Sequence, residues 1–374
     1  MHFKTLTALA LASLVSAQTY TECDPTKKTC PNDKAVGKEI INIDFTKGED
    51  NFFKNMVGTT IKYDNKLGAV YTIKKETDAP TVASSRYIFF GQVDVTVRAA
   101  FGKGIVTSFV LQSDDLDEID WEWIGSDHTQ VQTNYFSQGC TETYDRGGFS
   151  PVANPQDEFH TYTIKWTPTQ LDWIIDGTVV RTLKNDGQKG CSAFPQTPMQ
   201  IKLGTWVAGR KDAAQGTIEW AGGIADYSEG PFNGFYQSIK IQDYMGGDGI
   251  TGPKDATEYK YGDKSGTWQS IKVISGTSVS DADETTTKAP SKTSTATSTA
   301  TTLSTVPASS ASSAPDSSIS SLPIDSTLNN NGTTSTGDAA EATESGDVLT
   351  GGAGKLAMSI ASIGAALFAG AMLL

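Results

Sequence analysis

The chain has few cysteines and histidines, and its basic residues are not clustered. Of 374 residues, 4 are cysteine and 3 are histidine, and no CxxC pair occurs. This composition argues against a zinc site, and we expect no metal centre and no cofactor. Acidic residues outnumber basic ones by 43 to 30, which gives a net charge of −13. Nucleic acid is therefore not an expected partner, whereas a neutral polymer is compatible with this charge.

The first residues contain almost no charge. Residues 1–17 include a single lysine, Lys4, then an apolar run from Leu6 to Val15 and the small pair Ser16-Ala17. This pattern predicts a secretory signal peptide over residues 1–17, cleaved after Ala17. A buried N-terminal helix is the alternative.

The last residues contain no charge at all. Residues 356–374 are apolar, no basic segment follows them, and small residues precede them. Small residues, a short spacer and an apolar tail predict a GPI-attachment signal over residues 351–374, which is removed in the mature protein. Ser345, Gly346 and Gly352 are equally good attachment sites. A genuine tail anchor is the alternative; otherwise we expect membrane contact only through the lipid anchor.

Aromatic residues are missing before that tail. Residues 276–350 consist mainly of Ser, Thr, Ala, Pro and acidic residues, with no Phe, Trp or Tyr. Such a segment cannot bury enough apolar surface to offset its ordering entropy, so we expect a disordered, O-glycosylated stalk. The only N-glycosylation sequon, at Asn331, lies in this stalk. One folded domain, residues 18–275, remains.

Helical periodicity is scarce in this domain. Short alternating or β-branched runs separated by Gly, Asn, Asp and Pro predict strands, and Asp176-Gly177 predicts a hairpin turn. We therefore expect an all-β protein, a β-jelly-roll sandwich of two antiparallel sheets. The predicted strands cover residues 40–45, 69–74, 87–98, 105–112, 118–123, 161–166, 171–175, 178–183, 199–206, 217–220 and 235–242.

The four cysteines all lie in this domain. An even number in a secreted chain predicts two disulfides. Of the three possible connectivities, Cys23 with Cys30 and Cys140 with Cys191 costs the least loop-closure entropy.

The segment Asp117-Glu118-Ile119-Asp120-Trp121-Glu122-Trp123 alternates acidic with apolar residues. On a strand, the three carboxylates from Glu118 onward point to one face, and the apolar side chains point to the core. Like charges in one row repel, so an ordinary strand with a solvated acidic face is the weaker interpretation. We expect an interior strand whose carboxylates line a concave outer surface.

Two carboxyl groups can cleave a glycosidic bond. The Cα atoms of Glu118 and Glu122 would lie about 13 Å apart on a flat strand, so curvature and long side chains must bring the carboxyls together. A separation of about 5–5.5 Å indicates retention and about 6.5–9.5 Å indicates inversion; the spacing alone leaves both open. Asp120 can hydrogen-bond one glutamate and fix its rotamer. Its negative charge also raises the pKa of the neighbouring glutamate that must stay protonated. Rigid strand spacing spreads the three carboxylates too far for one Ca²⁺ or Mg²⁺ ion.

The motif Glu118-Ile119-Asp120-Trp121-Glu122 resembles the E-I-D-x-E signature of glycoside hydrolase family 16, whose members are jelly rolls that act on β-glucans with retention. Two later segments, 159–166 and 172–177, are similar to the strands that follow the catalytic strand in that family. Together with Thr133-Asn134-Tyr135-Phe136, the predicted stalk and both ends, they resemble the fungal Crh family of cell-wall transglycosylases.

The resemblance implies a retaining mechanism with Glu118 as nucleophile, Glu122 as general acid/base and Asp120 in support. It implies a monomer that joins donor chitin to β-1,6- or β-1,3-glucan acceptors in a glycan groove, at the cell wall and the outer surface of the plasma membrane. Lys202, Trp206 and Thr217 resemble family positions that contact the bound sugar chain. Glu122 would contact the sugar as well. Independently, rings pack on sugar faces, which makes Trp206 and Tyr135 candidate contacts; Trp121, Trp123, Trp166 and Trp173 are expected in the core.

Two other functions fit the sequence. A plain endo-acting hydrolase of chitin or β-glucan would use the same carboxylates and differ only in favouring water over a sugar acceptor. The alternative that is not an enzyme is a non-catalytic glycan-binding protein of the wall. Binding alone does not require three adjacent carboxylates.

Overall fold

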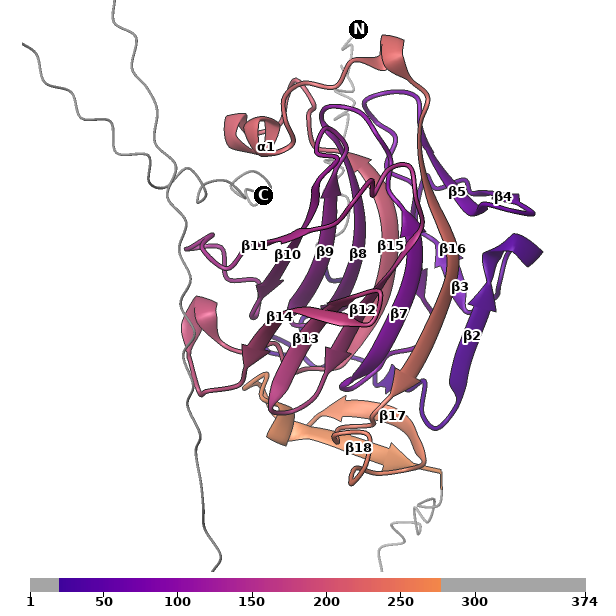
Figure 1. The fold of residues 1–374 in the computed structure, drawn as a ribbon. Helices are drawn as coiled ribbons and strands as arrows, with labels where there is room; N and C mark the ends of the chain where they lie inside the picture. The colour runs from indigo at the N-terminus through magenta and orange to yellow at the C-terminus, as the bar shows by residue number, and fades with distance from the viewer. Residues whose placement is uncertain (1–19, 277–374) are drawn as a thin grey trace, which may run out of the picture. The chain divides into compact units, whose positions relative to one another are not determined.

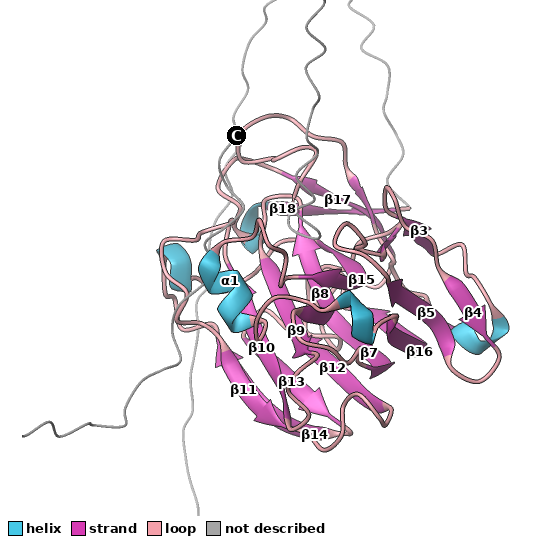
Figure 2. Cartoon of the chain, turned by 90° about the horizontal axis from the view of Figure 1, so that it is seen from above, coloured by secondary structure: helices cyan, strands magenta, loops and turns pink. Residues whose placement is uncertain are grey.

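The computed structural model describes residues 20–276, which form two large antiparallel sheets and one small sheet (Figure 1). The predicted signal peptide, most of the stalk with Asn331, and the attachment signal with Ser345, Gly346 and Gly352 lie outside the described residues. Strands make up most of the regular secondary structure of this domain, and the helical segments are short (Figure 2). The predicted all-β jelly-roll sandwich is confirmed.

The first sheet has seven strands and contains the acidic segment. In spatial order its strands are β11 (Gly148–Pro151), β10 (Gln130–Phe136), β9 (Glu118–Ile124), β8 (Ile105–Ser113), β15 (Met199–Val207), β6 (Thr81–Ser84) and β3 (Phe53–Asn55). Strand β9 is therefore an interior strand, as its sequence predicts.

The second sheet has eight strands. Its order is β14 (Thr178–Lys184), β13 (Gln170–Ile175), β12 (His160–Trp166), β7 (Gly91–Arg98), β16 (Phe232–Asp243), β5 (Gly68–Ile73) and β4 (Lys62–Asp64), while β2 (Ile40–Asp44) pairs with the end of β16. The predicted hairpin at Asp176-Gly177 joins β13 to β14, and both turn residues have positive φ. Two positive φ values are what a two-residue hairpin turn of type I′ requires.

The third sheet has three strands, and single helical turns join the other elements. The sheet consists of β1 (Asp33–Lys34), β17 (Ala256–Tyr261) and β18 (Ile271–Ser275). The helical elements are α1 (Gln215–Trp220) and the 3₁₀ turns η1 (Phe45–Lys47), η2 (Gly190–Ser192), η3 (Tyr227–Glu229) and η4 (Trp268–Ser270).

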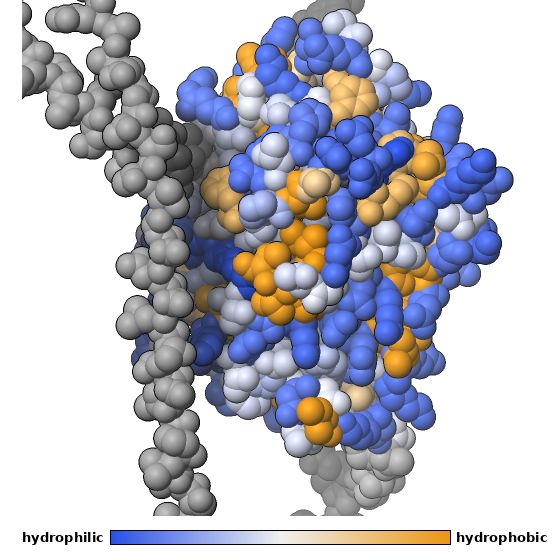
Figure 3. Space-filling view, in the orientation of Figure 1, coloured by the Kyte–Doolittle hydropathy of each residue, from blue (hydrophilic) through white to orange (hydrophobic). Residues whose placement is uncertain are grey.

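The core lies between the two large sheets and is rich in tryptophan. Trp121, Trp123, Trp166 and Trp173 are all 0% exposed, which confirms their predicted place. Burying each stabilises the fold by about 4–6 kcal/mol at about 25 cal/mol per Å². Outside, hydrophilic side chains cover most of the face shown in Figure 3, with smaller apolar patches between them. Among residues 20–276, no helix is long and apolar enough to cross a membrane.

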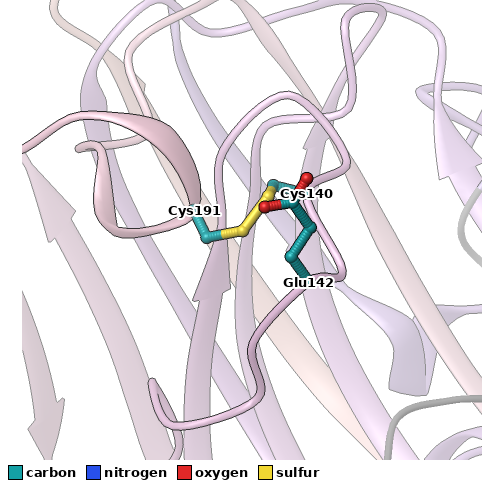
Figure 4. A group of neighbouring side chains, drawn as sticks. All are labelled: Cys140, Glu142 and Cys191. Atoms are coloured by element: carbon teal, nitrogen blue, oxygen red, sulfur yellow. A yellow bond between two sulfur atoms is a disulfide. The ribbon is translucent and has the colours of Figure 1, made fainter.

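Both predicted disulfides are present. Cys23 pairs with Cys30, and Cys140 pairs with Cys191. The second bond joins the loop after β10 to η2 (Figure 4). Within the described domain, these two sulfurs and the carboxylate of Glu142 are the only group with the spacing of metal ligands. Disulfide sulfurs are not thiolates, so this group does not make a zinc site.

One predicted strand is wrong. Residues 217–220 belong to helix α1, which ends where Gly222 takes a φ of 84° and the Gly223 N–H donates to the Ile218 carbonyl at 2.8 Å. This is the hydrogen bond of a glycine-terminated helix end. The glycine pair at 222–223 is a helix-termination signal in the sequence, and it indicates a helix more strongly than residues 217–220 indicate a strand. The strand predicted at 87–98 is β7, which begins only at Gly91.

Candidate active site

Strand β9 is fixed to the second sheet from its core side. Trp121 Nε1 donates to the Thr163 carbonyl at 3.4 Å, and Trp173 Nε1 donates to the Asp120 carbonyl at 3.0 Å. At the start of the strand, the Asp117 carboxylate accepts the backbone N–H of Gln196 at 2.7 Å and that of Gln138 at 2.9 Å. These bonds hold the backbone that carries the carboxylates.

The three carboxylates lie on the opposite face of the seven-stranded sheet, which we call the site face. Glu118, Asp120 and Glu122 are only 7%, 2% and 7% exposed. An outer face can bury its side chains this deeply only if neighbouring segments rise around them. The alternative of a solvated acidic strand is therefore wrong.

Burial changes the protonation of this row. Removal from water raises the pKa of Glu122 to about 8, and the negative charge of Glu118 adds to the rise. Burial, followed by the charges of Glu118 and Glu122, also holds the pKa of Asp120 well above its ordinary value. Glu122 therefore carries a proton at neutral pH, and a protonated carboxyl group can act as a general acid.

Gln112 on β8 faces Glu118 directly across the two strands. Its Nε2 donates to Glu118 Oε2 at 2.7 Å, and its Oε1 accepts a hydrogen bond from Lys202 Nζ. Lys202 is 4% exposed; burial lowers its pKa to about 8, against the opposing effect of Glu118. The structure thus brings Lys202 to the site, as predicted, and shows Gln112, which no sequence signal marked.

Two indole rings lie near the other end of the row. Trp206 and Trp220 stack with centroids 6.1 Å apart, and Trp220 Nε1 donates at 2.8 Å to Gln132, which faces Glu122 across β9 and β10. Trp206 Nε1 is buried without a hydrogen-bond partner among the described residues. Trp206 is on the same face of β15 as Lys202, and its contact with sugar stays a prediction. Trp220 was missed because its helix was not recognised.

The structure places two predicted sugar contacts, Tyr135 and Thr217, differently from what the sequence predicts. Tyr135 is 6% exposed and belongs to the core, opposite Ile119 in the register of β10 and β9. The prediction that it contacts sugar is therefore corrected: Asn134, opposite Asp120, faces the site instead. Thr217 lies on α1 rather than on a strand, three residues before Trp220 and hence on the same helix face.

The N-terminal segment also reaches the site. Lys202 Nζ lies 5.5 Å from the ring centroid of Tyr20, a residue that is 48% exposed. A cavity of about 550 Å³ lies elsewhere, between residues 74–76 and 224–228, and includes neither catalytic candidate. A much smaller one of about 10 Å³ touches Trp206.

Comparison with known proteins agrees with this geometry. Residues 48–222 match the model of glycosyl hydrolases family 16. Crh-like protein 5 of Aspergillus fumigatus is 47% identical over 275 residues, which cover 73% of this chain and 67% of the relative. Crh-like protein 3 of the same fungus is 47% identical over 278 residues, 73% of either chain. The chain belongs to the Crh family of glycosyl hydrolase family 16.

A solved structure extends the likeness to three dimensions. It is described as a Crh5 transglycosylase in complex with NAG; the TM-score is 0.63 at 47% identity, covering 68% of this chain and all of that one. The family and the enzyme class expected from the carboxylate motif are confirmed: this chain is a glycoside hydrolase or transglycosylase.

Proposed function

We propose that the protein is an extracellular retaining transglycosylase that cleaves chitin and transfers it to β-1,6- or β-1,3-glucan, cross-linking the fungal cell wall. The observation that carries this proposal is the buried row of Glu118, Asp120 and Glu122, in which Gln112 orients one glutamate and burial keeps another protonated. One carboxylate nucleophile and one carboxylic acid are what double displacement at a glycosidic carbon requires.

In the first step, an oxygen of Glu118 attacks the anomeric carbon of the donor, and the bond to the leaving oxygen breaks. Glu122 gives its proton to that oxygen, so the leaving chain departs as an alcohol. In the second step, Glu122 takes the proton of an acceptor hydroxyl, whose oxygen attacks the anomeric carbon and displaces Glu118. Asp120 supports Glu118 between the two glutamates, and its high pKa allows it to donate a hydrogen bond.

The donor class follows from chemistry and from the family. NAG, the sugar bound in the related Crh5 transglycosylase, is the repeating unit of chitin. The acidic domain has no clustered basic residues, which suits neutral chains such as chitin and β-glucan. Lys202, Trp206, Thr217 and Glu122 are our proposed sugar contacts.

The layout of the chain supports a place at the wall. Signal peptide 1–17, domain 18–275, stalk 276–350 and attachment signal 351–374 would carry a monomeric enzyme to the outer surface of the plasma membrane and the cell wall.

A transfer assay tests this function. The secreted domain is incubated with chitin oligomers and a fluorescent β-glucan acceptor. We expect labelled product of higher mass with wild type and none with Glu118→Gln. Shortened chitin without labelled product would make the enzyme a plain hydrolase, and binding without any product would make it a glycan-binding protein.

A further inference from the structure

Phe149, on the edge strand β11, has an exposed aromatic ring that takes no part in the two proposed reaction steps. The residue is 54% exposed. In the strand register, Phe149 lies opposite Gln132, and Gln132 lies opposite Glu122. Directly opposed residues of antiparallel strands point to the same face, so Phe149 lies on the site face in the row that crosses Glu122. Strands β11, β10 and β9 lie side by side in Figure 1.

The distance suits a bound oligosaccharide. Adjacent strands are about 4.8 Å apart, which puts the Phe149 backbone about 10 Å from that of Glu122. Between them lies Gln132, whose amide oxygen is held by Trp220. On the other side of Glu122 the same row continues with Ser108 and Gly204, which offer no ring.

Several hydrogen bonds and a disulfide hold the segment that leads to Phe149. Arg146, 4% exposed, donates from Nε to the Tyr135 carbonyl at 3.0 Å and from Nη2 to the Cys140 carbonyl at 3.0 Å. The Arg146 carbonyl in turn accepts from Arg181 Nη2 at 2.6 Å. The disulfide between Cys140 and Cys191 closes the same loop (Figure 4). An exposed ring on a fixed backbone loses little entropy when it binds a ligand.

We propose that Phe149 is the stacking platform for the acceptor glucan chain. This inference rests on the proposed transglycosylase function. The donor is held covalently at Glu118, beside Gln112 and Lys202, whereas the acceptor hydroxyl must reach Glu122, which takes its proton. Among the strand residues paired across the sheet with Glu122, Phe149 is the exposed aromatic one. The C–H faces of sugars pack on such rings. A second copy of this chain on the β11 edge is the competing occupant.

Transfer kinetics with both substrates varied test the assignment. We expect Phe149→Ala to raise the KM for the glucan acceptor by about three- to tenfold while the KM for the chitin donor keeps its wild-type value. Phe149→Tyr should restore the acceptor KM, and Phe149→Leu should not, because the flat ring is what matters. Ile250→Ala, another exposed apolar residue at 81% exposure, serves as the control and should change neither KM. An unchanged acceptor KM in Phe149→Ala, or an equal rise for the donor, would overturn the inference.

A binding titration separates this inference from the proposed function. β-Glucan oligosaccharide is titrated against Glu118→Gln with and without Phe149→Ala. Weaker binding in the double variant supports Phe149 even if wild type proves unable to transfer; equal binding overturns it. If size-exclusion chromatography shows a wild-type dimer that Phe149→Ala dissociates, the ring is a self-association contact and the inference is wrong.

Discussion

Gln112 Nε2 donates a 2.7 Å hydrogen bond to Glu118 Oε2 from the strand next to the catalytic one. The amide also accepts a hydrogen bond from the buried Lys202, so it links a cation to the proposed nucleophile. One oxygen of Glu118 is thereby fixed before substrate arrives. Such preorganisation lets a carboxylate attack without first reorganising its surroundings.

Removing that hydrogen bond should slow glycosylation. Gln112→Met keeps the side-chain volume but removes the hydrogen bond that Gln112 donates to Glu118. A hydrogen bond to a charged group contributes about 1.5–3 kcal/mol, so we expect kcat/KM for chitin oligomers to fall about 10- to 100-fold. Gln200→Met is the matched control, because Gln200 lies opposite Gln112 but donates to the Ser84 carbonyl. Equal rates for wild type and Gln112→Met would mean that Gln112 does not position Glu118.

The raised pKa of Glu122 predicts an alkaline limit of activity. The first step requires protonated Glu122, whose pKa is about 8, so kcat/KM should fall as the pH rises through that value. Glu122→Gln should abolish turnover of chitin oligomers while the circular dichroism spectrum stays native. With a donor whose leaving group needs no proton, the first step of Glu122→Gln should proceed without the alkaline limb. If that limb persists, another group is the acid; if the variant unfolds, Glu122 is structural.

Asp33 on β1 predicts a pH-dependent stability. It is 4% exposed, and burial, followed by the charges of Asp114 and Asp115, raises its pKa from 3.8 to about 9. The folded chain thus keeps Asp33 protonated at pH 7, whereas the unfolded chain ionises it. Its contribution to stability is complete below about pH 4 and is lost as the pH rises toward 9.

Asp33→Asn should remove this loss. We expect wild type and variant to melt at similar temperatures near pH 4, and the variant to melt higher at pH 8, by about 2–4 °C for each kcal/mol regained. Asp157→Asn, at an exposed position, should show no such divergence. Parallel melting curves for Asp33→Asn and wild type across this range would show that Asp33 is ionised in the folded chain.

The sequence predicted features that depend on local pattern. Alternation in residues 117–123 was enough to place the carboxylates and tryptophans on opposite faces, because side-chain direction has a period of two in any strand. The Asp176-Gly177 turn and the short Cys23–Cys30 loop are likewise local, and both are present.

Features that depend on pairing between distant strands were missed or wrong. Gln112 and Phe149 gained their roles through the registers of β8 with β9 and of β10 with β11, which the sequence does not show. Tyr135 was placed one residue out of phase with the site, and a shift of one residue on a strand exchanges the two faces. Trp220 was missed because α1 is a single short helix within a β-rich sequence.

The most direct test is the mass of the enzyme during turnover. Glu122→Gln is mixed with a chitin-oligomer donor that bears an activated leaving group, and the intact protein and its peptides are weighed. Because the second step lacks its base, a glycosyl-enzyme should accumulate, in which the peptide that contains Glu118 gains the mass of the glycosyl part of the donor, without the leaving group. Wild type with the same donor should show less of it, and Glu118→Gln none. Release of the leaving group without any adduct, or an adduct on a residue other than Glu118, would contradict retention through Glu118.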